Sequence, residues 1–158
     1  MRRIAVEPPV AVVSPHLDDA VLGCGQLLDA YPGAVVVTLF AGRPPRERRR
    51  RLTPWDADAG FAPGDDVVAA RRAEDAAALG LLGARPVWLR FLDAQYGGHD
   101  ETRRIGAVLA RALARRRVRD VFAPLGLYHS DHRRARESAL VARTLLPRAR
   151  WHLYADGL

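Results

Sequence analysis

Short apolar runs alternate with longer segments of helical period along almost the whole chain, and this alternation constrains the fold more than any other feature. Valine-rich runs are typical of buried strands, whereas apolar residues spaced three or four apart indicate amphipathic helices. Strand and helix in turn predict an α/β fold with a mostly parallel, Rossmann-like sheet in a three-layer αβα arrangement, helices covering both faces. The expected strands are 10–13, 35–40, 87–92, 118–123 and 151–154, and the expected helices are 19–28, 65–79, 101–117 and 133–146.

The length and composition indicate one domain spanning residues 1–158. A chain of 158 residues that is 49% hydrophobic can bury a substantial core. The segment 43–64 contains prolines, glycines and the run Arg48–Arg51 and has no clear period, so we expect a long loop there. A loop of this length is often a lid or a binding loop; a solvated, disordered insertion is weighted equally.

Localisation signals are absent from the sequence. Residues 1–13 lack the apolar core and the cleavage site of a signal peptide, and no apolar stretch is long enough to span a bilayer. The single cysteine, Cys24, cannot form an internal disulfide, which fits a reducing compartment. We therefore expect a cytoplasmic protein that has no membrane partner.

The formal net charge of +7 raises the alternative of a nucleic-acid partner. All 25 basic residues are arginine, because the sequence contains no lysine. Arginine without lysine is also what a biased codon usage produces, and we favour that explanation. Binding through an arginine-rich surface remains the alternative from another functional class, with the clusters at 48–51 and 115–117 as its candidates.

Two polar segments carry the candidate chemistry. Residues 14–19, Ser-Pro-His-Leu-Asp-Asp, follow the first expected strand, and residues 129–132, His-Ser-Asp-His, come shortly after the fourth. In open parallel sheets, ligands bind beyond the carboxyl ends of the strands. A catalytic zinc commonly takes three ligands from His, Asp or Glu and keeps one position open for water. Either segment alone could be a helix cap or a solvated turn, but their joint position favours a metal-dependent hydrolase.

The same segments resemble the LmbE-like, or PIG-L, family of zinc-dependent N-acetylglucosamine-type deacetylases. Residues 14–25 are similar to the family's N-terminal signature, and 129–132 to its His-x-Asp-His motif. The stretch 37–42 is similar to its second strand, and 71–80 to its arginine-glutamate helix. The resemblance covers nearly the whole chain, although relatives usually continue beyond the point where this chain ends.

The resemblance implies a role for each matching residue. His16, Asp19 and His132 would bind zinc. Asp18 would be the general base that takes a proton from the zinc-held water and could later protonate the leaving amine. His129 would stabilise the tetrahedral oxyanion or assist the leaving group.

Three further residues have implied supporting roles. Asp131 would orient one of the histidines, and Arg71 and Asp93 would contact the sugar. The expected activity is removal of an N-acyl group, N-acetyl in the first place, from an amino sugar or glycoconjugate. Iron(II) stays open as an alternative to zinc, because a site with two histidines and one carboxylate suits both metals. A catalytically inactive family member is a second alternative, and a homo-oligomer is left open.

Overall fold

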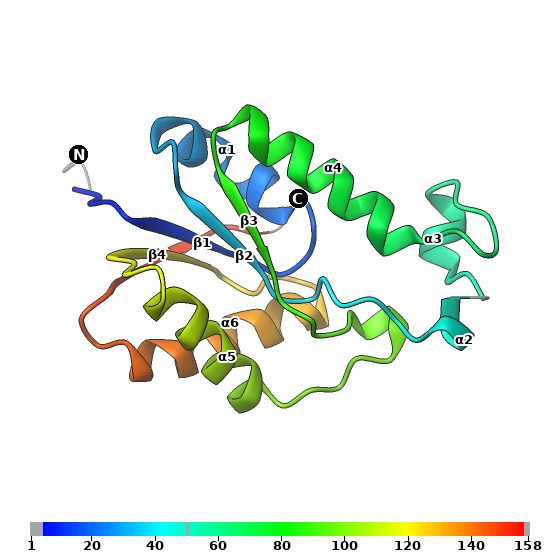
Figure 1. The fold of residues 1–158 in the computed structure, drawn as a ribbon. Coiled ribbons are helices and arrows are strands. Elements are labelled where there is room, and N and C mark those ends of the chain that lie inside the picture. The colour runs from blue at the N-terminus through cyan, green and yellow to red at the C-terminus, as the bar shows by residue number, and fades with distance from the viewer. Residues whose placement is uncertain (1–4, 50, 157–158) are drawn as a thin grey trace.

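A five-stranded sheet forms the centre of the computed structural model, which describes residues 5–49 and 51–156 (Figure 1). The strands lie in the order β3-β2-β1-β4-β5, and all four neighbouring pairs are parallel. The predicted α/β class is confirmed, and the sheet is wholly rather than mostly parallel. The strands are β1 (Val10–Ser14), β2 (Val35–Thr38), β3 (Arg85–Trp88), β4 (Asp120–Pro124) and β5 (Arg150–Tyr154).

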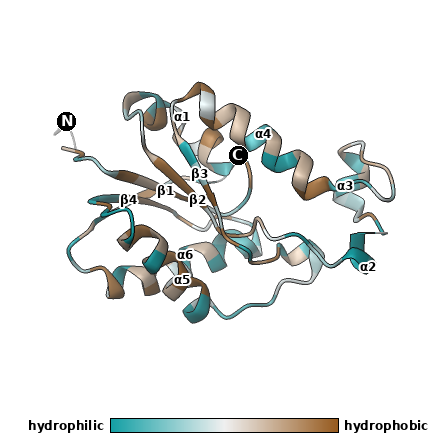
Figure 2. Ribbon diagram, viewed as in Figure 1, coloured by the Kyte–Doolittle hydropathy of each residue, from teal (hydrophilic) through white to brown (hydrophobic). Residues whose placement is uncertain are grey.

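Helices cover both faces of this sheet. In Figure 1, α1 (Asp19–Ala30) and α4 (Val67–Leu81) lie on one face, and α5 (Thr102–Ala114) and α6 (Ser130–Leu145) lie on the other. Side chains along a strand alternate between faces, so a strand covered on both sides must be apolar at every position. All five residues of β1 are buried, and β1 and β2 are coloured mainly as hydrophobic in Figure 2.

The segment expected as an irregular loop, 43–64, is partly helical, so that prediction was wrong in part. It contains α2 (Arg46–Arg49) and α3 (Pro54–Asp58), while Arg50 lies outside the described residues. Thr53 caps α3 by accepting a hydrogen bond from the backbone N–H of Asp56 at 3.1 Å, and proline occupies the first turn. These are ordinary helix-start signals, but the helix is too short to show a period.

Other elements differ from expectation mainly at their ends. β3 covers 85–88 instead of 87–92, and α6 begins at Ser130 instead of residue 133. The earlier start of α6 has a local cause, because His129 caps this helix with its Nδ1 atom. None of the helices within the described ranges is long and apolar enough to cross a bilayer.

A buried carboxylate ties the amino end of β4 to its neighbours. Asp120, fully buried, accepts hydrogen bonds from Arg150 Nε at 3.0 Å, from His152 Nε2 at 2.7 Å and from the backbone N–H of Glu7 at 2.8 Å. Burial raises the pKa of Asp120, but the hydrogen bonds from Arg150 and His152 outweigh it and lower the pKa to about 2. The carboxylate is therefore stabilised in its charged form by the folded chain.

We expect Asp120→Asn to lower the free energy of unfolding by about 1–3 kcal/mol near neutral pH, because buried donors lose a charged acceptor. A folded-state pKa below the ordinary value of 3.8 contributes stability above pH 3.8 that is lost as the pH falls towards 2. The difference between wild type and variant should therefore shrink between pH 4 and pH 2. Urea unfolding followed by circular dichroism across this range measures it, and a constant difference would contradict the assignment.

Candidate functional site

A cleft of about 980 Å³ opens beyond the carboxyl ends of the strands. Its walls include residues that follow each of the five strands, together with the helix α4. β1 lies between β2 and β4 in the sheet, so the connections that leave β1 and β4 diverge at this point, and ligands bind at such switch points. The cleft is lined by seven of the eight predicted site residues: His16, Asp18, Asp19, Arg71, Asp93, His129 and His132.

The turn between β1 and α1 is held by side chains that bond to its own backbone. Ser14 donates to the carbonyl of His16 at 2.7 Å and accepts from the N–H of Ala20 at 3.0 Å. Asp19 Oδ2 accepts from the backbone N–H of His16 at 2.8 Å. Ser14 thus satisfies one free N–H group in the first turn of α1, and Asp18 makes no side-chain capping bond.

Asp18 has an unusual backbone for a residue other than glycine, with φ 150° and ψ −33°. The Asp19 carboxylate contacts His16 and His132, whereas Asp18 makes no side-chain capping bond. Partial burial and the charge of Asp19 raise the pKa of Asp18, while His16 and Arg71 oppose that rise. A raised pKa brings a carboxylate closer to the range in which it is an effective base.

His16, Asp19 and His132 present atoms that could hold one metal ion. Asp19 Oδ2 lies 3.3 Å from His16 Nδ1 and 3.4 Å from His132 Nε2, and one donor atom from each residue falls within 4.8 Å of the others. Two imidazoles and one carboxylate at such spacing, on the wall of an open cleft, fit a catalytic zinc with a free position for water. The donor set therefore suits the metal that the resemblance implies.

A second group of possible ligands, His16, His129 and Asp131, shares His16 with the first. The carboxylate of Asp131 is fully buried and already has partners: Arg134 Nη1 at 2.8 Å and the backbone N–H of Ala94 at 2.9 Å. It also lies 3.3 Å from His16 Nε2. Asp131 thus fits an orienting role towards His16 better than a ligand role.

The carboxylates around His16 favour its protonated form in the metal-free chain. Burial alone would lower the pKa of His16, but hydrogen bonds to Asp131 and Asp19 and the charge of Asp93 raise it to about 10. The same contacts lower the pKa of Asp131. Since a metal ligand must be deprotonated, a bound cation would take the place of this proton among the same carboxylates.

His129 lies on the same side of the cleft as the other two imidazoles. Its ring centroid is 5.4 Å from that of His16 and 5.7 Å from that of His132. Its Nδ1 atom accepts a hydrogen bond from the N–H of Asp131 at 3.2 Å. In the neutral ring the proton therefore resides on Nε2, which makes that nitrogen a donor.

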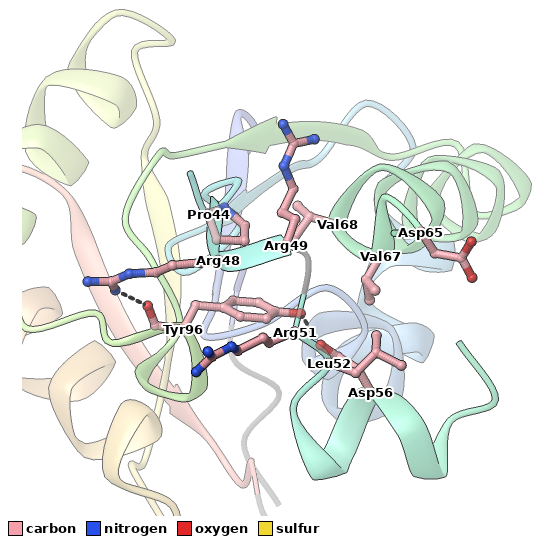
Figure 3. Close-up of a pocket in the computed structure, with 10 residues that line it drawn as sticks. All are labelled: Pro44, Arg48, Arg49, Arg51, Leu52, Asp56, Asp65, Val67, Val68 and Tyr96. Carbon is pink, nitrogen blue, oxygen red and sulfur yellow. Dashed lines mark hydrogen bonds between the residues drawn. The ribbon is translucent and has the colours of Figure 1, made fainter. Parts of the chain in front are cut away.

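The two predicted sugar-contacting residues are held by the segment 43–64 and its neighbours. Asp93 Oδ2 lies 3.6 Å from His16 Nε2 and accepts from Gln95 Nε2 at 3.0 Å. Arg71 pairs with the buried Asp56 of α3 at 3.1 Å, and Asp56 also accepts from the hydroxyl of Tyr96 at 2.8 Å. Figure 3 shows Tyr96 extended towards Asp56, with Arg48 bonded to its backbone carbonyl.

Several contributing residues were missed from the sequence. Asp156 lines the cleft and contacts His132, and its position directly after β5 follows the same rule as the predicted residues. The sequence offers a usable signal for it, namely an acidic residue at the carboxyl end of a strand. Asp56 and Tyr96, in contrast, come into contact only through tertiary packing, and no local sequence pattern predicts that contact.

Comparison with known proteins agrees with this geometry. The family model for PIG-L, described as GlcNAc-PI de-N-acetylase, matches residues 11–143. The chain belongs to the PIG-L family. A search of curated proteins gave no match.

Solved structures of this PIG-L member's relatives share its fold. A deacetylase triple mutant (Orf2*T) of the teicoplanin biosynthetic pathway is 32% identical to this chain, with a TM-score of 0.80. The A40926 pseudoaglycone deacetylase Dbv21 is also 32% identical, with a TM-score of 0.81. Each match covers 93% of this chain and 63% of the related chain. The zinc-inhibited form of teicoplanin deacetylase Orf2 is 27% identical, with a TM-score of 0.82, over 93% and 67%. The chain thus spans somewhat less than two thirds of the first two relatives.

We expect Asp18→Gly to stabilise this PIG-L chain. A non-glycine residue in such a backbone region costs about 1–3 kcal/mol, and glycine removes that strain at an entropic cost of about 0.5–1 kcal/mol. The free energy of unfolding should rise by up to about 2 kcal/mol, as measured by urea denaturation. Asp18→Ala, which removes the carboxylate and keeps the backbone strain, is the control. Equal free energies of unfolding for the two variants would show that the backbone at residue 18 is not strained.

Proposed function

We propose that this chain is a zinc-dependent hydrolase that removes an N-acyl group, N-acetyl in the first place, from an amino sugar or glycoconjugate. The observation that carries the proposal is the convergence of His16, Asp19 and His132 on one edge of the sheet, with Asp18 and His129 beside them. Membership of the PIG-L family and the deacetylase names of the similar structures support the reaction type.

The proposed metal centre consists of His16, Asp19 and His132. A bound zinc ion lowers the pKa of water towards neutrality and polarises a carbonyl group. The zinc-inhibited form of teicoplanin deacetylase, a similar structure, supports the binding of zinc by this fold. Asp131 holds the His16 ring through Nε2, so that Nδ1 is turned towards Asp19.

Asp18 is the proposed proton carrier. As the oxygen of water attacks the amide carbon, Asp18 accepts a proton from that water, and its raised pKa suits the task. When the carbon–nitrogen bond breaks, Asp18 returns the proton to the leaving nitrogen. The products are a carboxylic acid, acetic acid for an N-acetyl substrate, and the free amine; transfer of the acid's proton to the amine then gives the carboxylate and the ammonium ion.

His129 is the proposed stabiliser of the oxyanion. Because Nδ1 is occupied as an acceptor of the Asp131 N–H, Nε2 carries the donor proton. A donor aimed at developing negative charge is among the strongest contributions that a protein makes to acyl transfer.

The apolar side chains that line the cleft favour a substrate with an apolar part attached to the sugar. Three large side chains line the cleft and are nevertheless exposed: Leu22 by 62%, Trp55 by 70% and Tyr128 by 87%. Exposed apolar groups gathered around one cleft are typical of ligand-binding surfaces. Relatives named for teicoplanin and the A40926 pseudoaglycone support a glycopeptide-like conjugate over free N-acetylglucosamine. The free, buried thiol of Cys24 supports a cytoplasmic location.

The alternatives are less well supported. Three described arginines of the segment 43–64 are engaged by the protein itself: Arg43 and Arg49 pair with Asp66, and Arg48 bonds to the carbonyl of Tyr96. They are therefore poorly placed to contact nucleic-acid phosphates. An inactive relative is disfavoured because the ligands, the base and the oxyanion donor are all present around the cleft.

We expect purified protein to bind about one zinc per chain and His132→Ala to lose it, as measured by mass spectrometry of the metal content. Asp18→Asn should retain zinc but lose about 10²–10⁴-fold in kcat, because only the proton carrier is removed. Acetate released from aryl N-acetylglucosaminides measures turnover. The exposed His99 provides the control His99→Ala, which should change neither quantity. Full turnover by Asp18→Asn would refute the assigned base.

We expect Trp55→Ala to raise KM about tenfold for substrates with an aromatic or acyl aglycone, because one buried aromatic contact is worth about 1–1.5 kcal/mol. KM for free N-acetylglucosamine should stay unchanged. Leu153, which is also exposed but does not line the cleft, provides the control Leu153→Ala. Steady-state kinetics on the two substrate types measure the effect, and equal changes for both would rule out an aglycone contact.

A further inference from the structure

The carboxylate of Asp156 lies at the centre of a set of hydrogen bonds that the reaction described above does not use. Its Oδ2 atom lies 2.9 Å from His132 Nδ1. Its Oδ1 atom accepts from the backbone N–H groups of Gly126 at 3.0 Å and Leu127 at 3.2 Å. The Asp156 side chain is fully buried, so each bond is formed in a region of low dielectric where its direction matters most.

Asp156 is itself held in place by the end of β5. The hydroxyl of Tyr154, two residues earlier, donates to the carbonyl of Val13 in β1 at 2.9 Å. The carbonyl of Tyr154 accepts from the N–H of Leu125 at 2.9 Å. The carboxylate is therefore presented from a fixed position on the sheet, although it lies in the last part of the described chain.

The contact with His132 determines which ring nitrogen faces the candidate metal. A carboxylate only accepts hydrogen bonds, so the nitrogen that faces it, Nδ1, carries the proton. In a neutral ring, Nε2 is then free of a proton and offers its lone pair towards Asp19, which lies 3.4 Å away. Partners of this kind hold the ring orientation and raise the basicity of a metal-binding histidine.

The contacts with Gly126 and Leu127 act on the other wall of the cleft. These residues begin the connection from β4 to α6, which continues through Tyr128 to His129. Within this connection Tyr128 has a positive φ of 63°, which costs free energy for a residue other than glycine, so outside support helps the connection to keep its shape. Both of the backbone N–H groups at its start point to the one carboxylate of Asp156.

We infer that Asp156 is a positioning residue that orients His132 for metal binding and, with the same carboxylate, holds the connection that brings His129 into the cleft. The inference rests on the proposed function in that His132 is taken as a metal ligand. Asp156 acts on the reaction through these two histidines.

The test is zinc affinity, measured by competition with a chromophoric chelator. Asp156→Asn keeps the size of the side chain but has one acceptor oxygen. With this oxygen on the two N–H groups, the amide NH₂ faces His132 and donates to Nδ1, which moves the ring proton to Nε2. We expect the dissociation constant for zinc to rise about 10–100-fold. An unchanged dissociation constant overturns the inference.

Asp120→Asn is the matched control. Asp120 is also a buried aspartate that pairs with a histidine, His152, at 2.7 Å, and it lies at the opposite end of the same two strands. We expect this variant to be less stable yet to bind zinc as tightly as wild type. An equal loss of zinc affinity in both variants would mean that the effect is general destabilisation, and it overturns the inference.

A measurement on the wild-type protein covers the case in which Asp156→Asn does not fold. In zinc-loaded protein, nitrogen-15 spectra should show His132 coordinated through Nε2, with a slowly exchanging proton on Nδ1. Coordination through Nδ1, or a rapidly exchanging Nδ1 proton, overturns the inference. His132→Ala separates the two proposals: zinc retained in that variant refutes the metal centre itself, whereas zinc lost there but retained in Asp156→Asn refutes only the role of Asp156.

Discussion

The parallel pairing of β1 with β4 is the contact on which the whole site depends. Val10, Ala11 and Val12 pair in register with Asp120, Val121 and Phe122, so the two strands end side by side although more than a hundred residues separate them in the chain. The turn after β1 supplies Asp18 and one part of the metal group, and the segment after β4 supplies the rest. A shift of register by one residue would exchange the two faces of the strand. Such a shift is unfavourable because β1 contributes buried side chains to the hydrophobic clusters on both faces of the sheet.

Charge compensation is the second constraint, because buried ionisable groups are tolerated only when they are paired. Around the cleft each of the two imidazoles of the candidate metal site faces carboxylates with both nitrogens: His16 lies between Asp19 and Asp131, and His132 between Asp19 and Asp156. Asp19 is shared, which makes it the centre of the group. A divalent cation bound there would face one nitrogen of each ring, while the other nitrogen would keep its proton and donate it to Asp131 or Asp156.

The sequence was sufficient for the fold class and for most of the site, because both follow from local patterns. Valine runs indicated the strands, and polar residues just after them indicated the cleft. The order of the strands depended on contacts that no local pattern contains, whereas α2 and α3 are too short to show a helical period. His129 is an uncommon helix cap, and α3 is held by the bond between Asp56 and Tyr96, which are forty residues apart. Asp156 was missed because no motif surrounds it, although its place beyond the carboxyl end of β5 follows the rule that located the other residues.

The distribution of charge argues for a neutral substrate that becomes a cation. The chain has a formal charge of +7, yet the cleft is lined by several acidic residues and by one arginine, Arg71, which is already paired with Asp56. An anionic ligand such as a nucleic-acid phosphate would be repelled from these walls, whereas an uncharged amide enters without an electrostatic cost. Hydrolysis of that amide yields an amine that gains a proton and a carboxylate that carries a negative charge. In the proposed reaction the acidic walls would favour departure of the carboxylate, and a metal held by His16, Asp19 and His132 would compensate for their charge only at the centre of the cleft. We attribute the basic exterior to biased codon usage, as the absence of lysine indicates. Only the acidic cleft bears on the proposed hydrolysis of an amide.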